Sequence, residues 1–280
     1  MSPAGFGTEP FRSERLARGR LFSDELEEDP WVLFHGTSAN NIPSIETRGF
    51  TFEKHPLQLE GLRLLVEVFE TMNWVGSDMG GFAVLKTFSS SDFNGDAASS
   101  VFLAEFGVRA LRFATGEFAG GEKLRAVRRA YRDLERYRDD TELRAKHKAR
   151  CEKEVATLQS MGAAPSMIDA ARPRIFDLDW LDARLQVLKE LSASALEPAV
   201  NFTGGAVYAV RVNEGDLPIL QNRSPMGIAA LSTLSAARIT SKMKIPSSFE
   251  YNDFAIASDM KLLLRRNSAG VAAALSGRNR

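Results

Sequence analysis

The chain has 280 residues, of which 44% are hydrophobic and 26% charged, and its formal net charge is zero. This composition is typical of a globular protein with room for one domain and an insertion, and the balanced charge gives no overall field that favours nucleic acid or a membrane. Without an apolar run of membrane-spanning length or an apolar signal core, we expect a cytoplasmic protein, or one delivered into a target cell without a Sec-type signal. The single cysteine, Cys151, excludes an intrachain disulfide and a cysteine zinc site, and we expect it to be an exposed, unreactive thiol.

The chain begins with residues 1–29, which are rich in Gly, Pro, Arg and Glu and predict a flexible arm with a short helix near residues 23–28. Residues 31–37, with the sequence WVLFHGT, predict a buried strand that ends in a polar cluster. A helix over residues 40–48 follows, because an asparagine caps its start, a proline lies in its first turn and Gly49 ends it.

Apolar residues at helical spacing predict a helix over residues 57–72. A β-rich run over residues 80–92 comes next, and we infer a helix over residues 95–106 after it. A strand ending in Phe88 and a helix carrying Phe102 would place two aromatic rings on either side of a flat ligand. The alternative is that both rings belong to the core.

Residues 120–200 differ from their flanks and predict a helical insertion. Residues 122–154 contain twelve Lys or Arg and eight Asp or Glu, without Gly or Pro, and apolar residues recur at helical spacing. We interpret them as solvated helices packed as a hairpin or coiled coil, the second beginning at residues 139–142. A further helix around residues 180–191 ends near Pro198. The basic excess also suits an acidic partner such as RNA.

A β pattern returns over residues 205–212, and residues 217–220 suggest another strand. Residues 228–238 are rich in alanine and predict a helix. In residues 249–256, with the sequence FEYNDFAI, an acidic residue enters a strand of alternating apolar residues, a pattern that alone is typical of the polar rim of a sheet. We expect residues 269–280 to form a flexible tail.

The run His35-Gly36-Thr37, followed by a short helix and a glycine, resembles the opening motif of ADP-ribosyltransferases of the diphtheria-toxin and poly(ADP-ribose)-polymerase type. The resemblance implies that His35, with Thr37, holds the adenosine half of NAD and that the Gly36 backbone holds the nicotinamide amide. From its residue type alone, His35 has the alternative of a strand-end histidine satisfied by a neighbouring carbonyl.

Residues 80–102 resemble the middle motif of the same family, in which two tyrosines sandwich nicotinamide and a serine bonds its amide. The resemblance places Phe88 and Phe102 at the two rings and Ser99 at the serine. Phenylalanine keeps the π face of tyrosine and loses only the hydroxyl. If Ser100 instead takes the place of the second ring, the stacking is one-sided.

Residues 251–256 resemble the third motif, in which tyrosine, asparagine and a catalytic glutamate precede a strand. The resemblance places Tyr251 at the tyrosine and Asp253 at the glutamate, with Glu250 as the alternative carboxylate if the strand register differs. Because aspartate is one methylene shorter than glutamate, either the substrate sits closer or activity is reduced. The arginine, serine and glutamate class of these enzymes is a weaker match, since His35 stands where that class has arginine.

Together the motifs imply an α+β fold with an ADP-ribosyltransferase-like split antiparallel β-sheet core and a helical insertion. We expect the first half of that domain over residues 30–119, the insertion over residues 120–200 and the second half over residues 201–268. The implied activity is that of a bacterial or phage toxin or effector, which cleaves NAD at its nicotinamide–ribose bond and transfers ADP-ribose to a macromolecule.

This chemistry fits the residues. Cleavage leaves positive charge on the ribose, an oxocarbenium-like state that a carboxylate such as Asp253 stabilises. The chain has no Gly-x-Gly-x-x-Gly element, so a Rossmann mode of NAD binding is not supported. The alternatives are an inactive protein that binds NAD or ADP-ribose, and an NAD glycohydrolase. The acceptor, protein or nucleic acid, stays open; the insertion could contact a target, an inhibitor or an antitoxin, and no metal or membrane partner is expected.

Overall fold

A computed structural model describes residues 5–51, 100–118, 125, 131–132, 134–172, 177–200, 202–222, 227–252, 265–266 and 269–278. The chain divides into two compact units. The first comprises residues 1–55, 91–121 and 197–280, and the second comprises residues 56–90 and 122–196. The described residues form helices together with mixed and antiparallel sheets, so the predicted α+β class is confirmed.

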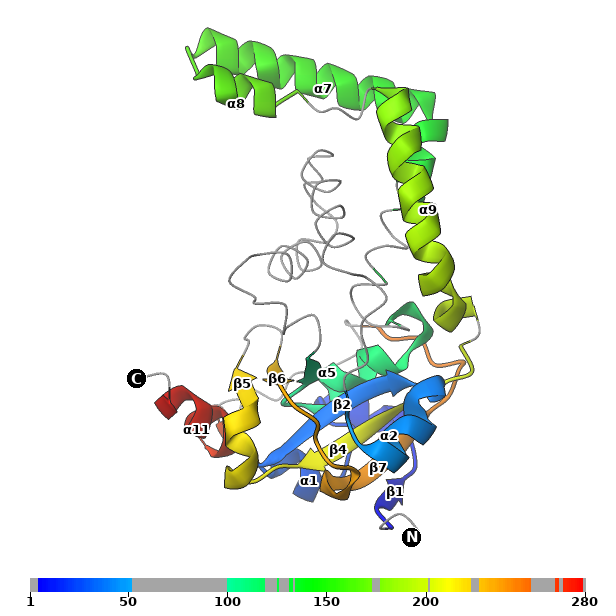
Figure 1. The fold of residues 1–280 in the computed structure, drawn as a ribbon, viewed down its shortest axis with the longest axis vertical. Coiled ribbons are helices and arrows are strands. Elements are labelled where there is room, and N and C mark those ends of the chain that lie inside the picture. Colours follow the sequence, from blue (N-terminus) through cyan, green and yellow to red (C-terminus); the bar gives the residue numbers. More distant parts are fainter. Residues whose placement is uncertain are drawn as a thin grey trace. The chain divides into compact units, whose positions relative to one another are not determined.

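The first unit contains a four-stranded sheet in the order β1-β7-β4-β2 (Figure 1). Its strands are β1 (Gly7–Glu9), β2 (Val32–Ser38), β4 (Gly205–Arg211) and β7 (Ile239–Ile245). Strand β1 runs parallel to β7, and the other pairs are antiparallel. The sequence predicted β2 and β4, whereas β1 and β7 were not expected.

A three-stranded antiparallel sheet in the order β3-β6-β5 lies beside it. Its strands are β3 (Val101–Leu103), β5 (Leu220–Asn222) and β6 (Ile228–Ala230). The two sheets meet at an isolated bridge, where Phe34 and Ala104 exchange backbone hydrogen bonds of 2.8 and 2.7 Å. The bridge does not extend into a regular ladder, so β2 and β3 separate on either side of it.

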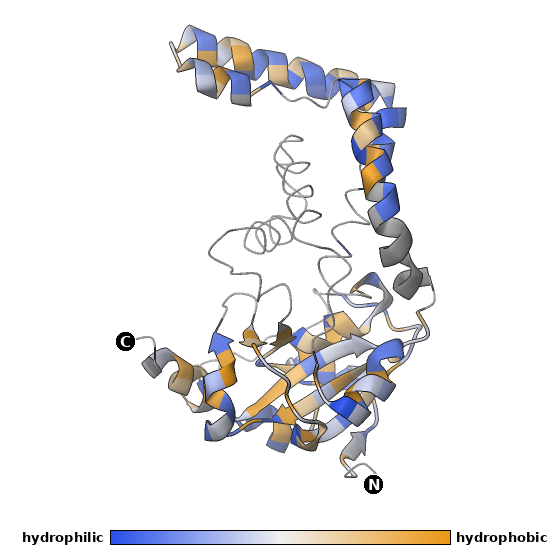
Figure 2. Cartoon of the chain, viewed as in Figure 1, coloured by the Kyte–Doolittle hydropathy of each residue, from blue (hydrophilic) through white to orange (hydrophobic). Residues whose placement is uncertain are grey.

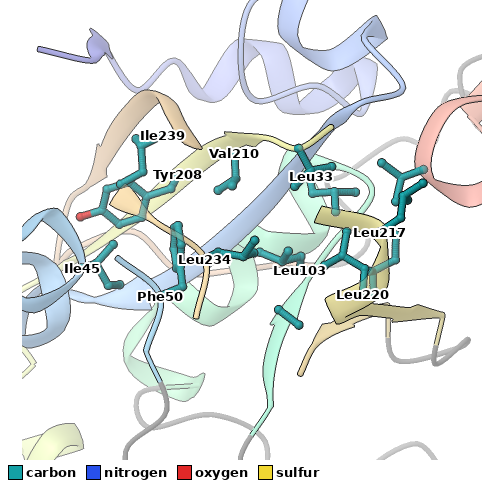
Figure 3. Packing of buried hydrophobic residues seen from close by; sticks show 14 of the residues in the cluster. Leu33, Ile45, Phe50, Leu103, Tyr208, Val210, Leu217, Leu220, Leu234 and Ile239 are labelled. Atoms are coloured by element: carbon teal, nitrogen blue, oxygen red, sulfur yellow. The ribbon is translucent and has the colours of Figure 1, made fainter. Parts of the chain in front are cut away.

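Strand β4 is buried on both faces, which explains its nearly continuous apolar sequence. Tyr208 and Val210 face a core between the two sheets (Figure 3). Val207 and Ala209 face a second core, built with Phe34 and the α5 region. In the hydropathy colouring of Figure 2, hydrophobic colours are frequent in the sheet region of this unit, alongside hydrophilic stretches.

Short helices connect and cover these strands. They are η1 (Ser13–Arg18), α1 (Asp24–Glu28), η2 (Ala39–Asn41), α2 (Ile42–Arg48), α5 (Gly107–Leu111), η4 (Arg112–Ala114), η5 (Gly116–Phe118), η7 (Glu214–Ile219), η8 (Ala236–Arg238) and α11 (Gly270–Arg278). The predicted helices at residues 23–28 and 40–48 correspond to α1 and to η2 with α2. Gly49 ends α2 with a φ of 79°, as its position predicted.

The predicted loose arm and tail are both corrected by the structure. Residues 7–9 form a strand of the main sheet, and Leu21 and Phe22 are fully buried. In the tail, Val271 and Leu275 are buried from one face of α11. Several apolar residues of these segments are spaced so that they reach the core, which composition alone does not reveal.

Three predicted elements between residues 95 and 238 are wrong where the structure describes them. Residues 101–103 form a strand rather than a helix, because Val, Phe and Leu pair with β6, and the helix begins only at Gly107. Residues 214–219 form a 3-10 helix, which Asn213 and Asp216 cap reciprocally. Residues 228–230 form a strand between β3 and β5, so pairing overrides the helix propensity of alanine.

The second unit is helical in its described part, with α7 (Thr141–Ser160), α8 (Pro165–Ala170) and most of α9 (Leu178–Val200). Asp140 caps α7 by accepting a hydrogen bond from the Leu143 N–H, which confirms the predicted start. Helix α9 runs two residues past Pro198, where it was expected to end. Within the described ranges, no helix is both long and apolar enough to cross a membrane.

Candidate functional site

The predicted site residues fall into three groups. His35, Gly36 and Thr37 lie on β2, Phe102 lies on β3, and Glu250 and Tyr251 lie on the segment after β7. Phe88, Ser99 and Asp253 lie outside the described residues, as do the predicted helix over 57–72 and the run over 80–92. The structure therefore brings together the opening motif and Phe102, at the point where the two sheets separate.

His35 spans the gap between the sheets. Its Nδ1 lies 3.0 Å from the backbone oxygen of Phe102, and because a carbonyl oxygen only accepts, Nδ1 carries the proton. The neutral imidazole then presents Nε2 as an acceptor, and Nε2 has no hydrogen-bond partner among the residues that the structure describes. The predicted carbonyl partner is thus present, and it occupies only one of the two ring nitrogens.

Burial lowers the pKa of His35 below its usual 6.5, although the bond to Phe102 opposes this shift. The imidazole of His35 is therefore protonated only at a lower pH in the folded protein than in the unfolded chain. His35 contributes stability above pH 6.5, and that contribution is lost as the pH falls toward the depressed folded-state pKa. At neutral pH, Nε2 remains a hydrogen-bond acceptor.

The strand register determines which backbone groups of β2 are directed toward β3. Alternate residues of an antiparallel strand direct their N–H and C=O groups to opposite neighbours. The Trp31 oxygen accepts from Val212 on the β4 side, whereas Phe34 bonds to Ala104 on the β3 side. Gly36 has the parity of Phe34, so its N–H and C=O are directed away from β4, toward the side of β3.

Gly36 also packs closely against α5. A Cβ at this position would overlap the carbonyl oxygen of Ala110 and come within 3.2 Å of the Phe113 Cβ. Position 36 therefore requires glycine, because another backbone segment approaches too closely for a Cβ. Its backbone polar groups still lie at the edge of β2 where the sheets part.

Thr37 and Asn41 form a hydrogen bond inside the same turn. The Asn41 Nδ2 donates to the Thr37 hydroxyl oxygen at 2.9 Å, and Thr37 is buried. Asn41 does not cap α2 with its side chain, contrary to the capping role predicted for the asparagine before this helix. The bond instead ties the end of β2 to the start of α2.

Glu250 and Tyr251 lie in a segment without helix or strand, and the strand predicted after Asp253 lies outside the described residues. Tyr251 is half-buried, and the guanidinium of Arg112 lies 5.9 Å from its ring centre and 4.4 Å from that of Phe118. Glu250 is exposed. Sequence reasoning missed Arg112, and its proximity in sequence to Phe113 and Phe118 was a possible signal.

Phe102 lies on a strand, not on the predicted helix. Its neighbours Val101 and Leu103 pack into the core between the sheets, so Phe102 projects from the opposite face of β3. The predicted pairing of its ring with Phe88 falls outside the described residues. The contact that the structure does show is through the Phe102 backbone, to His35.

Among the described residues, no group of three or more His, Cys, Asp or Glu side chains could hold a metal ion. A groove of about 350 Å³ in the second unit is lined by residues of α7 and by Ala171 and Arg172, and it contains none of the predicted site residues. Comparison of the chain with known proteins found no matching protein-family model, curated protein or solved structure.

Cys151 lines that groove and is buried, which corrects the expected exposed thiol. Burial raises the pKa of its thiol, and its Sγ lies 3.5 Å from the His147 Nε2. We expect iodoacetamide at pH 7.5 to label Cys151 at least tenfold more slowly in the native protein than in urea, because the thiolate is the reactive form. Mass spectrometry over time checks this, and equal rates would contradict the burial.

Proposed function

We propose that the protein is a mono-ADP-ribosyltransferase that cleaves NAD at the nicotinamide–ribose bond and transfers ADP-ribose to a macromolecular acceptor. The observation that carries the proposal is the state of His35. Its Nδ1–H is committed to the Phe102 oxygen, which leaves Nε2 as an acceptor at the junction of two sheets. A ribose hydroxyl is a donor of the kind that this nitrogen accepts.

Two further features support the same ligand. The backbone of Gly36, directed toward the β3 side, offers the paired donor and acceptor that a carboxamide such as nicotinamide matches. The arrangement of two sheets joined at one bridge agrees with the split sheet that the motifs imply. The proposed fold is therefore that of the ADP-ribosyltransferases, with residues 120–200 as the helical insertion.

In the proposed reaction, the bond between the nicotinamide nitrogen and ribose C1′ breaks, and nicotinamide leaves with the bonding electron pair. The ribose becomes an oxocarbenium-like cation, which Asp253, or Glu250 in another register, stabilises by its negative charge. A nucleophile of the acceptor then bonds C1′ and loses its proton. Gly36 and His35 hold the two halves of NAD, so that the scissile bond is presented in one geometry.

Two departures from the family motivate a second candidate, a protein that binds NAD without turnover. Aspartate stands at the position of the catalytic glutamate, and phenylalanine stands at both tyrosine positions. A glycohydrolase differs from both, since water takes the place of the acceptor. These three functions predict different fates of the ADP-ribose half.

The deciding experiment is incubation of the purified protein with NAD labelled in its adenylate half, together with cell lysate. A transferase attaches the label to a protease-sensitive or nuclease-sensitive macromolecule, which also identifies the class of acceptor. Asp253→Ala is expected to abolish attachment and nicotinamide release. Free labelled ADP-ribose would indicate a glycohydrolase, and binding without release would indicate the binding protein. Full activity of Asp253→Ala would refute the proposed carboxylate.

Two conservative variants of His35 distinguish the roles of its two ring nitrogens. Asparagine can replace the Nδ1–H donor but not the Nε2 acceptor, so His35→Asn is expected to keep the fold and weaken NAD binding by about tenfold, the loss of one hydrogen bond. His35→Gln can place an acceptor near the Nε2 position and serves as the matched variant. Calorimetric titration with NAD measures both. If His35→Asn binds NAD as tightly as the wild-type protein does, the Nε2 acceptor of His35 does not contribute to NAD binding, and the proposal loses its main support.

A further inference from the structure

One cross-strand row of the main sheet links His35 to a charged pair. His35 on β2 is paired with Tyr208 on β4, and Tyr208 is paired with Lys242 on β7. Residues directly opposite one another on adjacent strands project from the same face of a sheet. All three side chains therefore lie on the face that packs toward α2 and the core between the sheets.

The ring of Phe50 contacts both His35 and Tyr208. Its centre lies 5.1 Å from that of the imidazole and 5.9 Å from that of the Tyr208 ring, with interplanar angles of 72° and 84°. Both are edge-to-face contacts, which fix the relative tilt of the rings. Phe50 is itself held by backbone hydrogen bonds of 2.8 and 3.2 Å with Leu234 and is almost fully buried.

The far side of Tyr208 is tied to α2 by a carboxylate. Its hydroxyl donates to the Glu46 Oε1 at 3.1 Å, and in Figure 3 the Tyr208 oxygen points away from the centre of the core. The Lys242 Nζ donates to the same oxygen and lies 5.4 Å from the ring centre of Phe6. Glu46 is thereby bound by two donors from two strands, which fixes the helix that precedes Phe50.

We propose that Phe50 and Tyr208 are positioning residues for His35, which hold its imidazole in the one orientation that places Nδ1–H on the Phe102 oxygen and leaves Nε2 as an acceptor. The bond to the Phe102 oxygen sets the tautomer of His35, but a histidine ring turns readily about χ2, and a ring turned away from that oxygen loses the bond that keeps the proton on Nδ1. Phe50 packs against the imidazole and opposes its rotation about χ2, and Tyr208, anchored by Glu46, packs against Phe50.

The test is the tautomer of His35, read by nitrogen NMR of protein labelled at its three histidines, with His35→Asn assigning the signal. The wild-type protein is expected to show the Nδ1-protonated form. Phe50→Leu keeps an apolar side chain but removes the aromatic ring that contacts the imidazole, and we expect it to give a mixture of both tautomers. Tyr208→Phe keeps the ring and loses the bond to Glu46, and we expect a smaller shift in the same direction.

Phe6→Leu is the matched control, since Phe6 contacts the Tyr208 ring at 6.5 Å with no contact to His35. A merely structural role predicts that Phe6→Leu and Phe50→Leu both lower the melting temperature and leave the tautomer unchanged. That outcome overturns the inference. A tautomer mixture in Phe50→Leu, with a wild-type signal in Phe6→Leu, supports it.

The consequence for ligand binding rests on the proposed function. Phe50→Leu is expected to weaken NAD binding by about fivefold, because the Nε2 acceptor is then available for only part of the time. If the wild-type protein binds no NAD, the proposed function fails while the NMR result still decides the role of Phe50. If NAD binds equally well to both proteins, the orientation of His35 does not set the affinity, and the inference fails in its functional part.

Discussion

Gly36→Ala is expected to lower the free energy of unfolding by about 3 kcal/mol or more, a large effect for the addition of one methyl group. The new Cβ would overlap the carbonyl of Ala110, and because this obstacle is backbone, rotation of a side chain cannot relieve it. Either α5 moves away from β2, or β2 shifts against β4. Both movements disturb the core in which Phe34 and Leu111 are buried.

Urea unfolding followed by circular dichroism measures this loss. Gly277→Ala is the matched control, since no atom lies within 4 Å of a Cβ at that position of α11. There alanine is expected to stabilise the protein by about 0.5 to 1 kcal/mol, through its better helix propensity. Equal stability of Gly36→Ala and the wild-type protein would show that β2 and α5 are less closely packed than described.

Glu27→Ala is expected to cost about 3 kcal/mol of stability, because Glu27 satisfies buried backbone groups of two segments. Its carboxylate accepts from the N–H groups of Leu21 and Phe22 at 2.9 and 3.1 Å, and from that of Gly107 at 3.3 Å. Glu27 is fully buried, so no water replaces these bonds in the alanine variant. Arg266, which donates to the Glu27 backbone oxygen at 2.8 Å, extends the network to the C-terminal part of the chain.

The same residue predicts a pH dependence. Burial raises the pKa of Glu27 above its usual 4.5, so its contribution to stability is full below pH 4.5 and is lost as the pH rises through the folded-state pKa. Glu27→Gln cannot ionise. The stability of the wild-type protein relative to this variant is therefore expected to be greater at pH 4 than at pH 7, in urea titrations at both values. A relative stability that is greater at pH 7 than at pH 4 would mean that the hydrogen bonds lower the pKa of Glu27 by more than burial raises it.

The sequence was informative where one local pattern decided the structure. The run over residues 32–38 specified a strand because its apolar residues have no helical period, and Gly49 marked the end of α2 because a left-handed residue was needed there. The histidine was recognised as a candidate from its neighbours. The structure places it at the junction of the sheets, and its binding role stays a prediction. The cap of α7 at Asp140 was equally local.

The failures share a different cause. Residues 101–103 and 228–230 are too short to show a period, and they are strands because they pair with each other and because residues 228–230 also pair with β5. Strand β1 has the sequence GTE, which carries no β signal apart from its threonine, and its place is set by β7. Phe50 and Tyr208 were not recognised as neighbours of His35, since their contacts depend on a register that no local pattern encodes.

The pairing of β1 with β7 also constrains how the protein is made. Gly7 and Ser241, which are joined in that pair, are 234 residues apart in the chain. At a synthesis rate of about 5 to 20 residues per second, β1 waits roughly 10 to 50 s on the ribosome before its partner exists. Contacts so distant in sequence also slow folding after synthesis. A nascent chain therefore carries His35 long before it carries the complete sheet around it, and any activity at that residue is delayed until the second half of the chain has emerged.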